Sequence, residues 1–231
     1  MPDDYRGRPM IDNSKCKQGC AACTVACPTS AIEQRTDGIA MDLGRCLFCG
    51  ECAAVCPAEA IEFSRDYRTA VNRRQSLLVP DFNADRDALV ETARRVFRRS
   101  LRLRQVSAAG CNACEADTNV LGTLTFDLPR FGIDFVASPR HADGILVTGP
   151  VSENMKLALL KTYASIPEPK IVIAVGACAI SGGPFLDHKE VHNGITGLLP
   201  VDLFVPGCPP NPWTILDGLL RMLGIETPAA E

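Results

Sequence analysis

The sequence predicts an α/β protein in two parts: a small, cysteine-rich α+β unit at the N-terminus, and a larger unit built around a parallel sheet. Two observations predict the first part. Eight of the 12 cysteines lie in the first quarter of the 231 residues, and this stretch contains an internal repeat. One observation predicts the second part: beyond residue 100, short apolar runs alternate with stretches of helical spacing, which is typical of a sheet covered by helices.

Composition and charge exclude several classes of protein. The formal net charge is −3, which argues against nucleic acid as the main partner. The first ten residues are polar and charged, unlike a secretory signal. The longest uncharged stretch, 171–186, is interrupted by Gly182-Gly183-Pro184, so we expect no membrane-spanning helix. We therefore expect a cytoplasmic protein, where thiols stay reduced and many cysteines in one chain usually indicate metal.

The N-terminal repeat has a period of 29 residues. Residues 20–33 and 49–62 are identical at seven of 14 positions: three cysteines, then Pro, Ala, Ile and Glu. Each copy is too short to bury a core by itself, so we expect two similar βαβ-like halves that pack together. We assign residues 1–70 to this domain.

The cysteines of the second copy follow the pattern C-x2-C-x2-C-x3-C-P, which is typical of iron–sulfur ligands. They are Cys46, Cys49, Cys52 and Cys56. The first copy repeats the spacing with Cys20, Cys23 and Cys27, and Cys16 precedes them. Zinc is the alternative metal, but structural zinc prefers two C-x2-C pairs separated by a longer spacer. Two runs of four cysteines that each end in Cys-Pro fit zinc poorly.

These residues resemble a bacterial ferredoxin with two [4Fe–4S] clusters, a family in which the fourth cysteine of each run ligates the other cluster. The resemblance implies that the first cluster is held by Cys16, Cys20, Cys23 and Cys56. It implies that the second cluster is held by Cys46, Cys49, Cys52 and Cys27. One departure is that three residues, not two, separate Cys16 from Cys20. Gly19 can absorb the extra residue in a tight turn; if Cys16 does not ligate, the first cluster would be a three-iron cube.

Residues 71–100 are expected to form a basic linker with a helix. Nine arginines and only four acidic residues lie between positions 73 and 104. Apolar residues at helical spacing predict a helix over 87–101, capped by Asp85 or Asp87. Two interpretations stay open: a solvated basic face on a helix that packs on its own sheet, or a surface that docks on a partner subunit or an anionic membrane.

The second part, residues 101–231, alternates expected strands and helices. Apolar runs predict strands at 102–107, 134–137, 144–148, 171–175 and 201–205. Apolar residues at helical spacing predict helices at 153–165 and 212–223. The last helix has clear ends, because Asn211 can cap it, Pro212 suits its first position and Gly224 follows it.

Four cysteines remain for this second part: Cys111, Cys114, Cys178 and Cys208. Three of them follow expected strands, and the carboxyl ends of strands are where open α/β sheets bind ligands. A third [4Fe–4S] cluster is the simplest explanation for this convergence. Gly176 and Gly207 would let the backbone approach that cluster closely. Glu115 would lie beside it, either as a proton carrier or as a carboxylate favoured at a helix start.

The second part resembles the small subunits of energy-converting membrane-bound [NiFe] hydrogenases, including formate hydrogenlyase, and the related complex I subunit next to the quinone site. The matching segments are CNACE at 111–115, SPRHAD at 138–143, LVTGP at 146–150, GACAISGG at 176–183 and PGCPPNP at 206–212. The resemblance implies a flavodoxin-like domain whose four cysteines hold the cluster nearest the active site of a separate large subunit. It implies a non-catalytic electron-transfer subunit of an oxidoreductase.

One feature favours the hydrogenase branch of this family. The complex I branch has two adjacent cysteines at the first ligand site, whereas here Cys111 and Cys114 are separated by two residues, as in hydrogenases. We therefore expect three [4Fe–4S] clusters, a hydrogenase large subunit as partner, and further electron-input and membrane subunits that hold the chain on the inner face of the cell membrane. In these relatives the ferredoxin domain is usually a separate chain, so its fusion here is a departure.

Two alternatives to the hydrogenase interpretation stay open. The first is a complex-I-like oxidoreductase subunit that is linked to quinone or an antiporter and has no nickel in its partner. The second is a free ferredoxin-like carrier or redox sensor.

Overall fold

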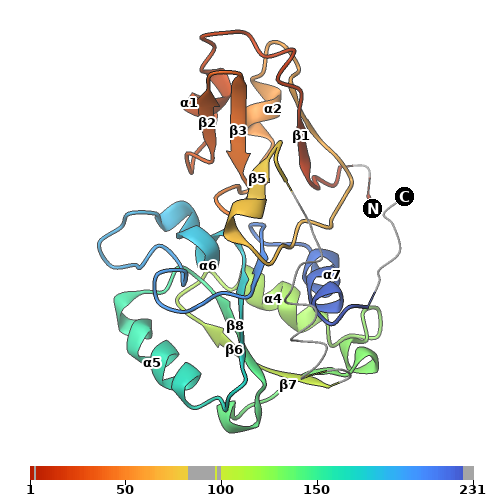
Figure 1. The fold of residues 1–231 in the computed structure, drawn as a ribbon, viewed down its shortest axis with the longest axis vertical. Coiled ribbons are helices and arrows are strands. Elements are labelled where there is room, and N and C mark those ends of the chain that lie inside the picture. The colour runs from red at the N-terminus through yellow and green to blue at the C-terminus, as the bar shows by residue number, and fades with distance from the viewer. Residues whose placement is uncertain (3, 83–96, 98–99, 226–231) are drawn as a thin grey trace.

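The structure is a computed structural model that describes residues 1–2, 4–82, 97 and 100–225. The cysteine-rich part and the part with the parallel sheet are stacked along the long axis of the molecule (Figure 1). The helix expected at 87–101 falls almost entirely outside the described residues. Its last residue, Leu101, is instead the first residue of a strand, because it pairs in register with Ile133.

The N-terminal repeat in sequence is also a repeat in structure. The first half consists of β1 (Pro9–Ile11), α1 (Ala22–Ala26) and β2 (Ile32–Arg35). The second half consists of β3 (Gly38–Asp42), α2 (Glu51–Ala54) and β4 (Ile61–Phe63). The three elements start at 9, 22 and 32 in one half and at 38, 51 and 61 in the other, a shift of 29 each time. β1 pairs antiparallel with β4, and β2 with β3, so every strand of one half pairs with a strand of the other.

The N-terminal sheet continues beyond residue 70. The 3-10 turn η1 (Arg74–Leu77) leads into β5 (Leu78–Val79), which pairs antiparallel with β3. Leu77 and Val79 are buried in the core. The boundary drawn at residue 70 from the sequence thus precedes the last strand of this sheet, since a strand of two residues has no period that a sequence pattern can show.

The second part is a five-stranded parallel sheet. Its strands are β6 (Leu101–Ser107), β7 (Ile133–Phe135), β8 (Gly144–Thr148), β9 (Ile171–Val175) and β10 (Leu203–Val205). They lie in the order β10-β9-β8-β6-β7, which along the chain is the flavodoxin-like order 2-1-3-4-5. The predicted α/β fold with a flavodoxin-like second part is confirmed. The predicted strands at 144–148 and 171–175 have the observed bounds, and the other three differ by one or two residues at one or both ends.

Helices cover this sheet and carry the connections between strands. They are α4 (Ala113–Val120), α5 (Glu153–Ala164), α6 (Ala177–Ser181) and α7 (Pro212–Met222), with short 3-10 turns η2 (Leu128–Phe131), η3 (Pro139–His141) and η4 (Gly183–Phe185). β8 and β9 are buried along their whole length, as expected for central strands covered on both faces. Asn211 caps α7 by accepting a hydrogen bond from the backbone N–H of Trp213 at 2.9 Å. No helix among the described residues is both long enough and apolar enough to cross a bilayer.

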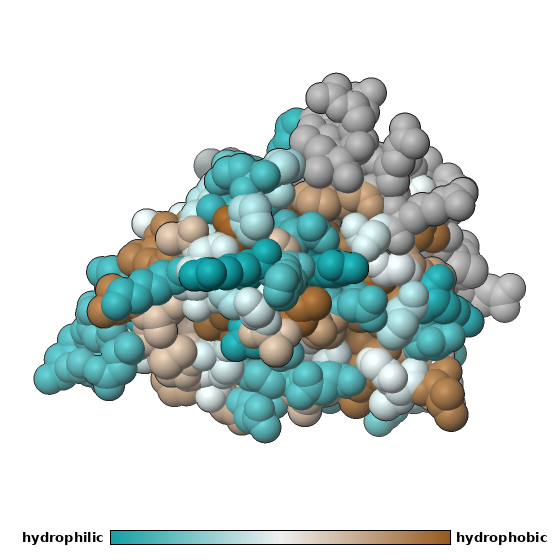
Figure 2. Space-filling view, turned by 90° about the horizontal axis from the view of Figure 1, so that it is seen from below, coloured by the Kyte–Doolittle hydropathy of each residue, from teal (hydrophilic) through white to brown (hydrophobic). Residues whose placement is uncertain are grey.

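The two parts contact each other through the main chain. Val71 and Phe204 exchange backbone hydrogen bonds of 2.9 and 2.8 Å, so the connecting segment lies along the edge strand β10. Arg221 of α7 donates to the carbonyl oxygen of Ala70 at 2.8 Å. The end of the molecule farthest from the N-terminal sheet, which is the lower end in Figure 1, has hydrophilic and hydrophobic residues interspersed (Figure 2), as on an ordinary solvent-facing surface.

Candidate iron–sulfur sites

The first expected set of cysteines lines one small cavity. Cys16, Cys20, Cys23 and Cys56 face it together with apolar residues such as Ile39 and Ala60. Burial raises the pKa of Cys23, and the nearby thiols of Cys16 and Cys56 raise it further. Cys56, from the second run, therefore lies with the three cysteines of the first run. This is the exchange that the ferredoxin resemblance implies.

The second expected set is also brought together. Burial raises the pKa of Cys46 to about 12 and that of Cys52 to about 11. Cys27 and Cys49 add to the increase for both thiols, so they lie close to both. Cys27 of the first run thus lies with three cysteines of the second run.

Backbone N–H groups point at three of these sulfurs. The N–H of Ala31 donates to Cys27 Sγ at 3.2 Å, and the N–H of Ala60 donates to Cys56 Sγ at 3.3 Å. The N–H of Phe48 donates a third such bond, to Cys46 Sγ, at 3.3 Å. The first two bonds are related by the repeat, because residues 31 and 60 are 29 apart. Hydrogen bonds of this kind stabilise a thiolate and help to set the potential of a cluster.

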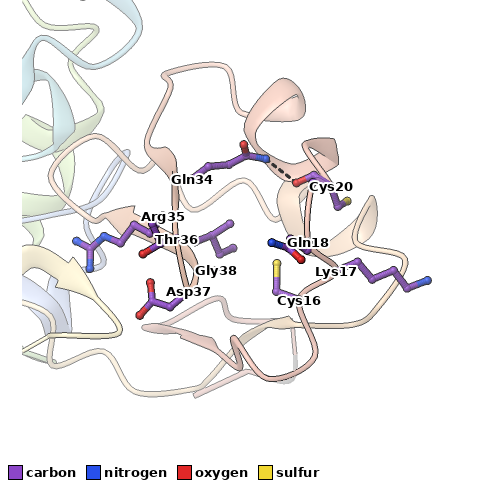
Figure 3. Close-up of a pocket in the computed structure, with 11 residues that line it drawn as sticks. Cys16, Lys17, Gln18, Cys20, Gln34, Arg35, Thr36, Asp37 and Gly38 are labelled. Atoms are coloured by element: carbon purple, nitrogen blue, oxygen red, sulfur yellow. Dashed lines mark hydrogen bonds between the residues drawn. The ribbon is translucent and has the colours of Figure 1, made fainter.

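The loop with the extra residue has the expected turn. Gly19 has φ of +77°, in the left-handed region, and no atom lies within 4 Å of where its Cβ would be. Figure 3 shows this loop on one side of a polar cavity whose other side is the hairpin around Asp37. Gln34 of β2 donates to the carbonyl oxygen of Cys20 at 2.7 Å, which fastens the loop to the sheet (Figure 3).

The third set gathers at the carboxyl ends of the parallel strands. Burial raises the pKa of Cys114 strongly and that of Cys178 to about 12. The thiols of Cys111 and Cys208 raise both pKa values further, so all four lie close together. Cys111 follows β6, and the strand order reverses between β6 and its neighbour β8. Flavodoxin-like sheets bind ligands at this point.

Two glycines make room for the third set. Gly176 has φ of +91°, and a Cβ there would lie 2.5 Å from Cys114 Sγ. Gly183, which was not predicted as a site residue, would place a Cβ 2.9 Å from Cys178 Sγ. At Gly207, where the same role stays an expectation, a Cβ would collide with Pro210. Gly207 is therefore required by the turn that carries Cys208.

Glu115 lies beside the third set and is buried. Its Oε1 accepts hydrogen bonds from the hydroxyls of Ser107 and Thr148, both 2.6 Å long. These residues are the last of β6 and β8 and face each other in register. Burial raises the pKa of Glu115, but the two hydroxyl donors outweigh it and the net pKa is lowered. Glu115 is also in the first turn of α4, as expected, but its two partners were not foreseen.

The donor chemistry of the three sets fits iron–sulfur clusters. Buried thiols with raised pKa values lose their protons only when cations neutralise the thiolates, and iron supplies that charge. Among the described residues, no three Cys, His, Asp or Glu side chains are gathered closely enough to hold a single metal ion.

Family models match both parts of the chain. The model of the 20 kDa subunit of NADH ubiquinone oxidoreductase matches residues 111–222. A model described as a 4Fe-4S dicluster domain matches residues 15–60. Each match falls within one of the two parts of the chain.

Curated relatives match about half of the chain. Formate hydrogenlyase subunit 7 of Escherichia coli (strain K12) is 44% identical over 56% of this chain and 51% of its own length, so the chain spans about half of that relative. A subunit of the NADH-quinone oxidoreductase of Heliobacterium modesticaldum is 42% identical over 53% of this chain and 71% of its own length. Probable membrane-bound hydrogenase subunit mbhJ of Pyrococcus furiosus is 42% identical over 51% of this chain and 71% of its own length.

The chain belongs to the family of the 20 kDa subunit of NADH ubiquinone oxidoreductase, and it carries an additional 4Fe-4S dicluster domain. The dicluster domain and the many cysteines of the chain support the presence of iron–sulfur clusters. Its relatives are subunits of oxidoreductase complexes, which agrees with the expected non-catalytic, electron-transferring subunit.

Proposed function

We propose that the chain relays electrons through three [4Fe–4S] clusters to or from a catalytic large subunit, in a membrane-associated [NiFe] hydrogenase or a formate-hydrogenlyase-like complex. The observation that carries the proposal is that Cys111, Cys114, Cys178 and Cys208 gather at the carboxyl ends of the parallel strands. These residues come from three separate strand ends, so no local spacing requirement explains their meeting.

The residues of the chain would hold and tune the clusters. The first cluster is assigned to Cys16, Cys20, Cys23 and Cys56, and the second to Cys46, Cys49, Cys52 and Cys27. The third is assigned to Cys111, Cys114, Cys178 and Cys208. When bound, each cluster accepts one electron and passes it on. The chain contributes spacing, burial and N–H groups aimed at sulfur, whereas bond-making chemistry belongs to the partner.

The exposure of the third set supports a partner subunit at that edge. Cys178 is buried, whereas Cys111 and Cys208 are exposed. A cluster held there would have one side open to solvent, and a large subunit docked on that side would cover it. We propose that this partner, together with electron-input and membrane subunits, places the chain on the inner face of the cell membrane.

Co-purification followed by metal analysis tests this proposal. Tagged protein isolated without oxygen from its own host should bring with it a large subunit that contains nickel. A large subunit without nickel would overturn the hydrogenase assignment. A monomer with no associated subunit would overturn the relay within a complex.

A complex-I-like module is the second candidate function. The observation in its favour is the 42% identity to an NADH-quinone oxidoreductase subunit over 71% of that relative. This candidate predicts a nickel-free large subunit and electron transfer to an added quinone. The two-residue separation of Cys111 and Cys114 favours the hydrogenase over it.

A further inference from the structure

The second and third sets of cysteines are joined by one short contact between the two parts of the molecule. Gly44 precedes the ligand Cys46 by two residues, and Ser181 follows Cys178 by three. The Ser181 hydroxyl donates to the carbonyl oxygen of Gly44 at 2.8 Å, and both residues are buried. A chain of covalent bonds with a single hydrogen bond therefore connects a ligand of the second set with a ligand of the third.

The absence of a side chain at residue 44 permits this contact. A Cβ on Gly44 would lie 2.8 Å from Ile180 Cγ2 and 2.8 Å from Cζ of Arg74. Atoms cannot approach so closely, so any side chain at this position would move α6 away from the N-terminal sheet or displace the arginine.

An ion pair holds Gly44 from the other side. Arg74 of η1 and Asp42 at the end of β3 form two parallel hydrogen bonds, of which Nη1 to Oδ1 is 2.7 Å long. Asp42 Oδ1 also accepts the backbone N–H of Gly44 at 2.8 Å. The side chains are 27% and 16% exposed, so water competes only partly with this bidentate pair.

We propose that Gly44 is the junction that sets the electron-transfer distance between the second and third clusters, with Arg74, Asp42 and Ser181 as positioning residues. The inference rests on the proposed function. In the step it serves, one electron leaves the reduced second cluster, which is oxidised by one, and enters the third, which is reduced by one. No proton is transferred and no bond is made or broken. The rate of such a step falls steeply as the cofactors separate, so the fit at Gly44 controls it.

The test is electron paramagnetic resonance of the full chain, assembled with iron and sulfide without oxygen and then reduced. Neighbouring reduced clusters split and broaden each other's signals, and this magnetic interaction weakens with distance. The variants are Gly44→Ala, Ser181→Ala, Arg74→Gln and Arg74→Lys. The controls are Gly197→Ala, where no atom lies within 4 Å of the new Cβ, and Arg102→Gln, an exposed arginine at the far end of β6. Cys178→Ser, which removes a ligand of the third cluster, provides the spectrum of an uncoupled second cluster.

The expected result is selective. Gly44→Ala and Arg74→Gln should keep the iron content of the unaltered chain while the signal of the second cluster changes towards that of Cys178→Ser. Interaction between the first and second clusters should persist, Arg74→Lys should lose less coupling than Arg74→Gln, and the controls should match the unaltered chain. If Gly44→Ala loses iron, the coupling measured in Ser181→Ala and Arg74→Gln tests the proposal in its place.

The possible failures are distinguishable. Full iron with unchanged coupling in Ser181→Ala and Arg74→Gln would overturn the junction and leave the relay intact. An unaltered chain that never binds three clusters would overturn the relay itself.

Discussion

Gly176 shows how a single missing side chain shapes the third site. Its φ of +91° is unfavourable for any other residue, and a Cβ would lie 2.5 Å from Cys114 Sγ. We expect Gly176→Ala to prevent assembly of the third cluster only, so that the chain keeps about eight of about twelve iron atoms, four for each cubane. Iron and sulfide analysis measures this loss. Gly197→Ala is the matched control, and a full iron content in Gly176→Ala would contradict the assignment.

Glu115 provides a second prediction at this scale. Burial raises its pKa, but hydrogen bonds from Ser107 and Thr148 lower it by more, so the group is a carboxylate at neutral pH. A negative charge next to a cluster opposes the addition of an electron. Glu115→Gln should therefore raise the midpoint potential of the third cluster and leave the other two unchanged, as followed by a redox titration. An equal shift of all three would indicate a general change in the fold.

The same carboxylate gives a dependence of stability on pH. The lowered pKa means that ionised Glu115 stabilises the folded state at neutral pH, and this contribution is lost as the pH falls through that pKa. Thermal unfolding should thus be less sensitive to acid in Glu115→Gln than in the unaltered chain.

Residues were predictable from the sequence where the chemistry is local. All the cysteines of the first two sets could be proposed as ligands from the sequence, because the spacing of ligands around a cube is fixed within a few residues. The partners of Glu115 were not, because Ser107 and Thr148 meet only through strand pairing. Gly44 was missed for the same reason, since Ser181 is 137 positions away.

At the scale of elements, helices α1 and α2 are each followed by a cysteine that lies with the other N-terminal set. Cys27 follows α1 but lies with the cysteines around α2, whereas Cys56 follows α2 but lies with the cysteines around α1. Cys56→Ser should therefore disturb the same spectroscopic signal as Cys16→Ser, and Cys27→Ser should disturb the other. Disturbance of one common signal by Cys56→Ser and Cys52→Ser would show that each run holds its own cluster. No effect of Cys16→Ser would show that Cys16 is not a ligand.

The start of α7 gives a prediction about stability. Asn211 satisfies the backbone N–H of Trp213, and the helix behind it is almost wholly buried. Asn211→Ala should lower the free energy of unfolding by about 1 kcal/mol, the usual cost of losing such a cap. A shift of the urea midpoint measures it, and Asn211→Ser, which keeps a capping oxygen, is the control.

Elements with a strong pattern were predicted well, and short or irregular ones were not. The central strands β8 and β9 are continuous apolar runs, and α7 has both of its end signals, so the sequence places all three closely. α6 is only five residues long and β5 only two, and neither is long enough to show a period. Both nevertheless lie next to the contact between the two parts.

At the scale of the whole molecule, the order of the strands explains how cysteines far apart in sequence meet. The order 2-1-3-4-5 was expected only from resemblance, because pairing between strands depends on tertiary contacts that no local pattern encodes. Once that order is given, the loops that follow β6, β9 and β10 all begin at the same side of the sheet, at the carboxyl ends of its parallel strands. The third site is thus a consequence of topology, whereas the first two are consequences of spacing.

This difference predicts how the chain responds to the loss of one site. All ligands of the first two sets lie between residues 16 and 56, whereas those of the third lie between 111 and 208. Cys111→Ser or Cys208→Ser should therefore remove one cluster and leave two, so that about eight of about twelve iron atoms and the coupled signals of the N-terminal pair remain. Both residues are exposed, so the substitution disturbs little packing. Simultaneous loss of all three clusters would mean that the two parts cannot assemble separately, and that the contacts between them govern folding.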